Sequence, residues 1–417
     1  MPPATVLSFS LVLATLIAGH TVSGRDPAAS PEVIVMDSEW LAAAKAALTE
    51  GNTELAPALD QLVEEADAAL TAGPFTVMSK TLRPPSGDRH DYLSFGPYWW
   101  PNPDTEDGLP YVRRDGERNP ETRTERSDAF NLHRMTDSVD SLALAYYFTG
   151  NTRYADRAAL LLHTWFLNPE TAMNPNLDFG QAIPGLVDGR GIGIIESRQF
   201  LLAIDAALLI RNSDAWTEAD HRSLQEWFRA YLSWLQSSPN GIDESRTVNN
   251  HGTWYDAQLI AFALFCGDRE TAIRVLQTVG KSRIAAQISA DGKQEHELAR
   301  TKSLNYSAMN LEGMFTLARL GGKVGVDLWD YPTGDVAALP AALDFIAPYM
   351  DPEQPWPYEQ ISDFDPVRLL PLLRQGYLVY GDPEYLRLIE SGDDEAFRRH
   401  RSVLLFPIEV VKPVSSP

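Results

Sequence analysis

Residues 217–235, TEADHRSLQEWFRAYLSWL, decide the fold because they have the pattern of one amphipathic helix from end to end. The large apolar side chains recur at intervals of three and four positions: Leu224, Trp227, Phe228, Tyr231, Leu232 and Leu235. This spacing puts all of them on one helical face. Thr217 and Asp220 form an approximate capping box, which predicts where the helix begins. We expect the apolar face to pack against other helices.

Three further places along the chain carry the signal for a pair of connected helices. Gly150-Asn151, Gly267-Asp268 and Gly381-Asp382 each follow an apolar helical stretch. A glycine ends such a helix and an Asn or Asp caps the next one, so each place predicts a helical hairpin. Strand signals are poor, apart from short candidates near residues 404–411.

This series of hairpins favours an all-α fold, an incomplete barrel of hairpins known as an α/α toroid. An open repeat array is less suitable, because no period of about 34 or 40 residues recurs in the chain. No break in composition marks a second domain. We therefore expect residues 25–417 to form a single domain.

The composition restricts the partners that the chain can have. Of its 417 residues, 44% are hydrophobic and 22% charged, which is ordinary for a folded protein. The net charge of −22 argues against nucleic acid, since phosphate binding requires a basic face. A local cluster of arginines can still bind an acidic sugar. The single cysteine, Cys266, excludes an internal disulfide and is expected to be a buried apolar residue.

The first 24 residues resemble a secretory signal peptide. An apolar run over residues 6–18 is followed by small and polar residues, with a plausible cut after Gly24. This predicts a secreted or periplasmic protein. The segment before the run lacks Lys and Arg, which leaves a disordered or anchoring N-terminus as the alternative. No other apolar run approaches the roughly 20 residues of a membrane span.

Two irregular regions, residues 83–125 and 174–190, interrupt the helical pattern and are expected to carry function. In the first, Tyr98, Trp99 and Trp100 stand between prolines, so they are displayed on a rigid loop that suits stacking against sugar rings. Five arginines follow in the same region: Arg113, Arg114, Arg118, Arg123 and Arg126. We interpret the two groups as a binding surface for an acidic glycan; the alternative places the aromatic residues in the core.

Two short segments bring together the residues that suit one reaction. The first is Asn249-Asn250-His251, and the second runs from Glu297 through Arg300 and Lys302 to Tyr306. Neutral amide and imidazole groups with a guanidinium can bind a carboxylate and stabilise the negative charge that builds on it. A tyrosine beside cations can then remove the proton from the adjacent carbon. The chemistry predicted is the elimination of a sugar oxygen next to a uronate carboxylate.

Each segment also has a structural interpretation. His251 lies at the start of an apolar helical stretch, where a histidine is often structural. Arg300 and Tyr306 are six residues apart, which is not one helical face, so the helix must break between them or a loop must curl around the site. The alternative makes the charged residues a solvated helix face with Tyr306 in the core.

A metal site is not expected. His296-Glu297 begins a zinc-binding pattern that needs a second histidine at position 300, where the chain has arginine. No other pair of histidines has ligand spacing. We therefore expect no metal and no cofactor.

At these residues the chain resembles the alginate lyase superfamily, polysaccharide lyases with an α/α toroid fold. The matching pieces are residues 94–103, Asn249-Asn250-His251, and Glu297-Leu298-Ala299-Arg300 with Tyr306. The resemblance covers most of the chain, from about residue 77 to residue 380. The two catalytic pieces are moderately specific singly and quite specific together, in this order and spacing.

The resemblance implies a role for each matching residue. Asn250 and Arg300 would neutralise the uronate carboxylate, and His251 would assist there or act as an alternative base. Tyr306 would be the base and also the acid that protonates the leaving oxygen. Apart from the resemblance, we expect Asn249, Lys302, Arg113 and Arg114 to bind substrate together with the aromatic loop.

The spacing of Arg300 and Tyr306 is one residue shorter than in the mannuronate-cleaving branch of the superfamily. The Pro-Tyr-Trp-Trp-Pro loop is more similar to the branch that includes family 38 lyases, among which glucuronan is a reported substrate. The resemblance therefore implies a β-1,4-linked uronan, with glucuronan slightly ahead of mannuronate-rich alginate.

Two other classes of function remain open. A glycoside hydrolase on the same fold would need a pair of carboxyl groups, for which Asp291, Glu295 and Glu297 are candidates. A non-catalytic glycan-binding helical protein would make His251 and Tyr306 incidental.

Overall fold

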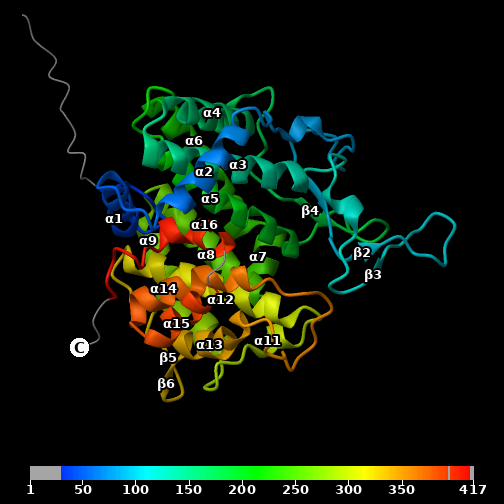
Figure 1. The fold of residues 1–417 in the computed structure, drawn as a ribbon. Coiled ribbons are helices and arrows are strands. Elements are labelled where there is room, and N and C mark those ends of the chain that lie inside the picture. The colour runs from blue at the N-terminus through cyan, green and yellow to red at the C-terminus, as the bar shows by residue number, and fades with distance from the viewer. Residues whose placement is uncertain (1–29, 393–394, 414–417) are drawn as a thin grey trace, which may run out of the picture.

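A computed structural model describes residues 30–392 and 395–413 of the chain. The leader predicted over residues 1–24 lies outside these residues. Within the described ranges the chain is mostly helical, as predicted, and no helix is long and apolar enough to cross a membrane. Figure 1 shows α2 to α6 in one half of the molecule and α11 to α15 in the other, with α8 between them.

The helices follow one another through short connections. The first eight in chain order are α1 (Ser38–Thr49), α2 (Ala56–Ala69), α3 (Ala129–Thr149), α4 (Thr152–Leu162), α5 (Phe200–Leu209), α6 (Glu218–Ser237), α7 (Pro239–Ser245) and α8 (Asn250–Phe265). They are followed by α9 (Arg269–Val279), α10 (Ala285–Gln287), α11 (Glu295–Leu298), α12 (Ser303–Gly322), α13 (Ala338–Ile346), α14 (Leu370–Tyr380), α15 (Pro383–Ser391), α16 (Glu395–Arg399) and α17 (Ser402–Leu405).

The predicted helix ends are confirmed. The Thr217 side chain accepts from the Asp220 backbone N–H and Asp220 bonds back to Thr217, which completes the capping box of α6. Gly150 ends α3 and Gly381 ends α14 with φ of 72° and 68°, values that glycine adopts without strain. Asn151, Asp268 and Asp382 cap the helices that follow. The pairs α3–α4, α8–α9 and α14–α15 therefore form the three expected hairpins.

Short strands occur only as pairs in the part of the chain that the structure describes. They are β1 (Leu93–Phe95) parallel with β4 (Phe179–Ala182), β2 (Trp99–Trp100) antiparallel with β3 (Val112–Arg113), and β5 (Pro332–Thr333) antiparallel with β6 (Val336–Ala337). The prediction of a short strand near residues 404–411 is wrong. That segment begins as α17 and continues in turns, because residues 402–405 pack as a helical turn against α1.

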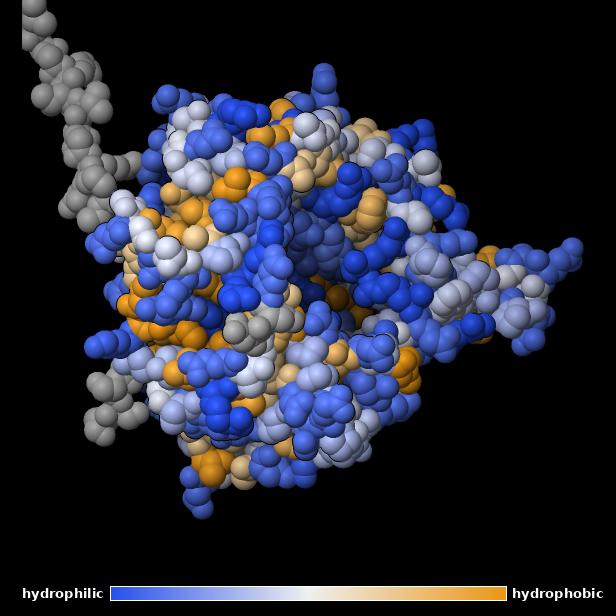
Figure 2. Space-filling model, in the orientation of Figure 1, coloured by the Kyte–Doolittle hydropathy of each residue, from blue (hydrophilic) through white to orange (hydrophobic). Residues whose placement is uncertain are grey.

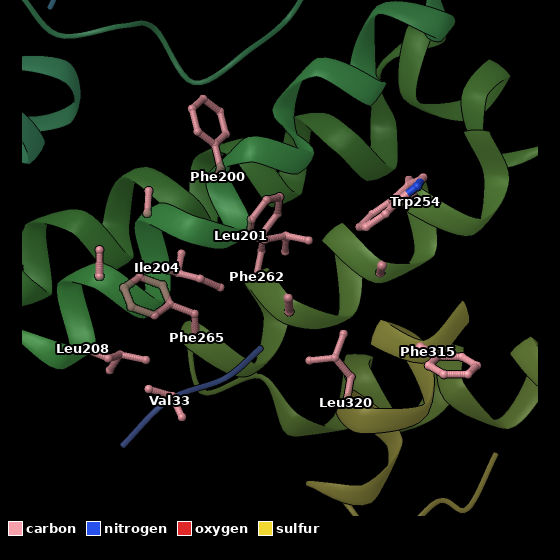
Figure 3. Packing of buried hydrophobic residues seen from close by; sticks show 14 of the residues in the cluster. Val33, Phe200, Leu201, Ile204, Leu208, Trp254, Phe262, Phe265, Phe315 and Leu320 are labelled. Atoms are coloured by element: carbon pink, nitrogen blue, oxygen red, sulfur yellow. The ribbon is translucent and has the colours of Figure 1, made fainter. Parts of the chain in front are cut away.

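The core is built around α8, with α5 and α12 beside it. Figure 3 shows Phe200 and Ile204 of α5, Phe262 and Phe265 of α8, and Leu320 of α12 in this packing. In α8 every residue except His251 and Leu264 is buried, so the helix has no solvent face. Its uniform burial explains why it has no clear apolar stripe. Cys266, at its end, is buried as predicted.

The two ends of the described chain pack together. Helix α16 lies beside α2, and α17 beside α1 (Figure 1). The Arg401 guanidinium bonds to Glu65 of α2 and Asp140 of α3, and Arg399 Nη2 lies 2.5 Å from Glu64 Oε2. These ion pairs join the last helices to the first.

The two irregular regions meet on one face of the molecule. The parallel pairing of β1 with β4 joins the first region to the second. The β2–β3 hairpin projects from the edge of the helical body (Figure 1), and the face beside it is hollowed, with hydrophilic residues around the hollow (Figure 2).

Candidate active site

A cavity of about 360 Å³ lies between the hairpin region and the helical body. Its walls come from the segment before and including β2, from η2 (Pro120–Arg123), from the start of α3, from β4 and from η4 (Gly191–Gln199). The first turns of α8 and α12 complete it. The predicted residues Asn249, Asn250, His251, Arg300 and Tyr306 all line this one cavity.

The hydroxyl of Tyr306 is the meeting point of three segments. It lies 2.6 Å from the Tyr98 hydroxyl, and Arg300 Nη2 donates to it at 3.0 Å. The chain breaks between α11 and α12, which frees Arg300 to turn back over the Tyr306 ring, 3.9 Å from its centroid. The solvated-face interpretation is therefore wrong for these residues.

The pKa of Tyr306 differs from the expectation that nearby cations would favour the phenolate. Burial, followed by the neighbouring Tyr98, raises this pKa above that of an ordinary phenol. Arg300 acts in the opposite direction but does not outweigh the burial. Lys302 contributes no contact to the Tyr306 hydroxyl, because it stands at the N-terminal end of α12 with its backbone bridged to Gln360.

Arg300 is held by a carboxylate that the sequence did not single out. Asp115 accepts from Arg300 Nε at 3.2 Å and Nη2 at 2.9 Å, and also from Thr301 and Arg113. Burial raises the pKa of Asp115, but these bonds outweigh it and hold the value at about 2. Gly116 follows at φ 75°, and a side chain there would collide with Thr301. The hairpin is thus bonded across the cavity to the α11–α12 connection.

Asn250 is fixed from the opposite helix by Glu297. Its backbone N–H and its Nδ2 each donate to one oxygen of the Glu297 carboxylate at 2.7 Å. Asn249 caps α8 by accepting from the His251 backbone N–H at 3.2 Å. The Asn250 amide keeps a second N–H, and its Oδ1 is buried without a partner among the described residues. Asn250 therefore lines the cavity with a side chain that is fully buried.

His251 is oriented by a buried carboxylate. Its Nδ1 lies 2.7 Å from Glu244 Oε1, and the Glu244 side chain is almost fully buried. Because a carboxylate accepts, Nδ1 carries the proton and Nε2 is left for a ligand. Glu244 lies seven residues upstream on α7, and no motif marked it in the sequence.

The aromatic loop divides into residues with different surroundings. Trp99 lines the cavity, with Arg190 5.9 Å from its ring centroid. Trp100 does not line it: its Nε1 donates to the Glu117 carbonyl at 2.9 Å, and Arg114 lies over its ring. Tyr98 uses its hydroxyl on Tyr306.

The predicted set is therefore brought together only in part. Trp100, Arg114 and Lys302 are not among the cavity residues, because neighbours on a two-residue strand point apart and Lys302 belongs to the helix end. Arg113 lines the cavity and is paired with Asp115 at 2.8 Å. The residues that sequence reasoning missed are His133, Gln181, Arg190, Glu196 and Arg198.

The cavity is rich in positive charge. Arg113, Arg118, Arg123, Arg190, Arg198 and Arg300 line it, whereas Glu196 is the one carboxyl residue among its described lining. The local charge is therefore opposite in sign to the chain's net charge of −22. Such a cavity is suited to an anionic ligand. No group of three metal-ligating side chains occurs among the described residues.

We expect Trp99→Ala to raise KM for a long polymer, with a smaller effect on kcat. An aromatic face that stacks on a sugar ring binds ground and transition states alike, so its loss weakens binding uniformly. Trp100→Ala is the matched control, since its ring lies outside the cavity. Steady-state kinetics on both variants provide the measurement, and an equal rise in KM for Trp100→Ala would contradict the assignment.

Solved structures that share this fold include alginate lyases. An alginate lyase from Bacteroides ovatus is 39% identical, with a TM-score of 0.85 over 90% of this chain and 99% of that one. Alginate lyase A1-III from Sphingomonas species A1 is 17% identical, with a TM-score of 0.56 over 91% of this chain and 96% of that one. Alginate lyases have the α/α toroid fold, which confirms the predicted toroid. Comparison with curated protein sequences finds no match.

Fold and site together define the class of the protein, which is a polysaccharide lyase on a helical toroid. A family model described as alginate lyase matches residues 76–356, more than half of the chain. The chain belongs to the alginate lyase family.

Proposed function

We propose that the chain cleaves a β-1,4-linked uronic acid polymer by β-elimination and leaves a 4,5-unsaturated uronate end. The observation that carries this proposal is the Tyr306 hydroxyl, bonded to Tyr98 and Arg300 in the cavity that Asn250 and His251 also line. Mannuronate-rich alginate and glucuronan are the two polymers that this chemistry favours. The 39% identical relative is named an alginate lyase, which makes alginate the first polymer to test. The predicted leader agrees with an exported enzyme that meets its polymer outside the cytoplasm.

In this mechanism the carboxylate of the sugar is bound before its neighbouring carbon loses a proton. Asn250 and His251 line the cavity, and we assign the second N–H of Asn250 and the Nε2 of His251 to this carboxylate. Negative charge grows on the carboxylate as the C5–H bond breaks, so donors placed there stabilise the transition state more than the ground state. Arg300 has Nε and Nη2 committed to Asp115 and Tyr306, so we assign its charge chiefly to the Tyr306 oxygen.

Tyr306 performs both proton transfers. Its phenolate takes the C5 proton, the C4–C5 double bond forms, and the C4–O bond breaks. The phenol then returns a proton to the leaving oxygen. In mannuronate and glucuronate the C5 hydrogen and the C4 oxygen lie on the same side of the ring, so one hydroxyl can reach both. In guluronate they lie on opposite sides and a second group would be needed.

The hydrolase alternative loses its candidate residues. Glu297 is buried and bonded to Asn250, and Asp291 is paired with Lys293 at the surface. Neither these two nor Glu295 lines the cavity. A pair of carboxyl groups on either side of a glycosidic bond is therefore missing from the described lining.

Incubation with polymannuronate, polyguluronate and glucuronan tests the proposal. A lyase produces the ultraviolet absorbance of the unsaturated sugar, a hydrolase produces only new reducing ends, and a binding protein produces neither. We expect absorbance from polymannuronate or glucuronan and little from polyguluronate. Reducing ends without absorbance would overturn the proposal, and equal cleavage of polyguluronate would overturn the one-tyrosine mechanism.

We expect kcat/KM to rise from neutral into alkaline pH. The base must be deprotonated, and burial with Tyr98 raises the pKa of Tyr306, so the phenolate fraction is small at neutral pH and grows as pH approaches that pKa. The increase continues until unfolding or a second titration intervenes. A pH–rate profile measures it, with chelator present and absent, and chelation should leave the rate unchanged. An optimum near about pH 5, within reach of a carboxyl base, would contradict this assignment.

A further inference from the structure

One wall of the cavity carries three arginines and a histidine that have no role in the proposed chemistry at Tyr306. Arg118 and Arg123 come from the segment before η2 and from η2 itself. His133 comes from α3, and Arg198 from η4. All four line the same cavity as the catalytic tyrosine but come from different elements than Asn250 and Arg300.

Arg123 contacts His133, and the charges of Arg198 and Arg118 also act on this ring. Arg123 Nη2 lies 3.4 Å from His133 Nε2. Burial, and then the charges of Arg123, Arg198 and Arg118 in that order, lower the pKa of His133 to about 4. At neutral pH this ring is uncharged, so its Nε2 can accept from the Arg123 guanidinium.

The positive charge of this wall is not balanced by ion pairs. Among the described residues, Arg118, Arg123 and Arg198 make no salt bridge, whereas Arg113 and Arg300 in the same cavity share Asp115. The direct contacts of Arg198 are uncharged: its Nη1 lies 2.9 Å from the sulfur of Met309, and its guanidinium lies over the ring of Trp254. The Glu312 carboxylate also acts on Arg198, but without a salt bridge between them.

The described cavity lining also contains one carboxyl residue, Glu196, whose charge acts on Arg123. Glu196 Oε2 accepts from the hydroxyls of Tyr92 and Ser94, at 2.9 and 2.6 Å. Burial raises the pKa of Glu196 above its ordinary value. Three guanidinium groups around a neutral ring therefore present unused donors to the cavity.

We propose that Arg118, Arg123 and Arg198 form a second carboxylate-binding subsite, which takes the carboxylate of a sugar unit other than the one that loses its proton. This inference rests on the proposed function, because it assumes a polymer with repeated acidic units. A guanidinium donates two N–H groups in the plane that a carboxylate accepts, and the bound anion offsets the mutual repulsion of the three cations. The enzyme then selects chains in which at least two units within the cavity are uronates.

The kinetic test uses oligouronates of increasing length, prepared from the polymer that the wild-type enzyme cleaves. We expect Arg118→Gln and Arg123→Gln each to lower kcat/KM for long oligomers by about tenfold, mainly through KM. The shortest oligomer that is still cleaved does not reach the subsite, so its kcat/KM should be unchanged. Arg134→Gln is the matched control: Arg134 is exposed on α3 next to His133, lies outside the cavity, and carries the same charge.

The binding test uses calorimetric titration of Tyr306→Phe, which cannot turn over its ligand. We expect a tetrauronate to bind more tightly than the same oligomer with its carboxyl groups reduced to alcohols. Adding Arg118→Gln and Arg123→Gln should remove most of this preference, while adding Arg134→Gln should keep it. Both substituted arginines are exposed, and a melting curve for each variant checks that folding is retained.

The outcomes separate this inference from the proposed function. If the wild-type enzyme cleaves a polyuronate but the two cavity variants bind and cleave it as Arg134→Gln does, the second subsite is wrong and the lyase stands. If no polyuronate is cleaved, the proposed function fails. A tetrauronate that then also fails to bind in preference to its reduced form overturns the subsite as well.

Discussion

Tyr306→Phe is expected to abolish most turnover while substrate binding survives. The substitution keeps the ring under Arg300 and removes only the oxygen that lies 2.6 Å from Tyr98 and 3.0 Å from Arg300. Removing a general acid–base group typically lowers the rate by about 10²–10⁴-fold, and more where one residue performs both transfers. The loss should appear in kcat with little change in KM.

Tyr98→Phe is the control for that variant. It removes the same hydroxyl–hydroxyl bond but leaves the Tyr306 oxygen in place. Because Tyr98 is one cause of the raised pKa of Tyr306, its loss should move the alkaline rise of the pH–rate profile to lower pH. More than about a tenth of wild-type activity in Tyr306→Phe, well outside the general-base range, would show that Tyr306 is not the base.

His251→Ala and Asn250→Ala are expected to lower the rate by about 10²–10³-fold each, the usual effect of losing one donor to developing negative charge. The two residues stand on the first turn of α8 and line the cavity beside Tyr306. Steady-state kinetics with the ultraviolet assay measure the loss. Melting curves are needed for Asn250→Ala, because it leaves the buried Glu297 with one fewer donor.

Glu244→Gln tests whether Glu244 acts on His251 by orienting its ring or through the negative charge of the carboxylate. The glutamine keeps an oxygen that can accept from Nδ1 but removes the negative charge behind the ring. We expect a smaller loss than in His251→Ala. If His251 were the base, His251→Ala would lose the alkaline rise in rate, whereas retention of that rise at a lower rate supports Tyr306 as the base.

The helical framework could be predicted because its signals are local. The capping box of α6 lies within four residues, and the glycine and Asn or Asp pairs lie between neighbouring helices. The segment Asn249-Asn250-His251 is also a local signal, because Asn249 caps the helix on which Asn250 and His251 stand. Short-range rules of this kind do not depend on the rest of the fold.

The parts that the sequence could not predict depend on pairs far apart in the chain. Asp115 is 185 residues from Arg300, and Tyr98 is 208 from Tyr306. No spacing rule connects such residues, so the carboxylate that holds Arg300 and the phenol that raises the pKa of Tyr306 could only be found in the structure. The same is true of Trp99 and Trp100, whose side chains point apart on an irregular loop.

The burial of α8 on all sides has a consequence for how the enzyme loses activity on heating. Amide groups of a helix without a solvent face exchange with deuterium only when the whole molecule opens. Asn250 and His251 are mounted at the start of that helix, and Glu297 holds the first of them from α11. Their geometry should therefore persist for as long as the native state does. Thermal inactivation and loss of tertiary structure should follow one curve, and no warm, folded but inactive state should precede melting.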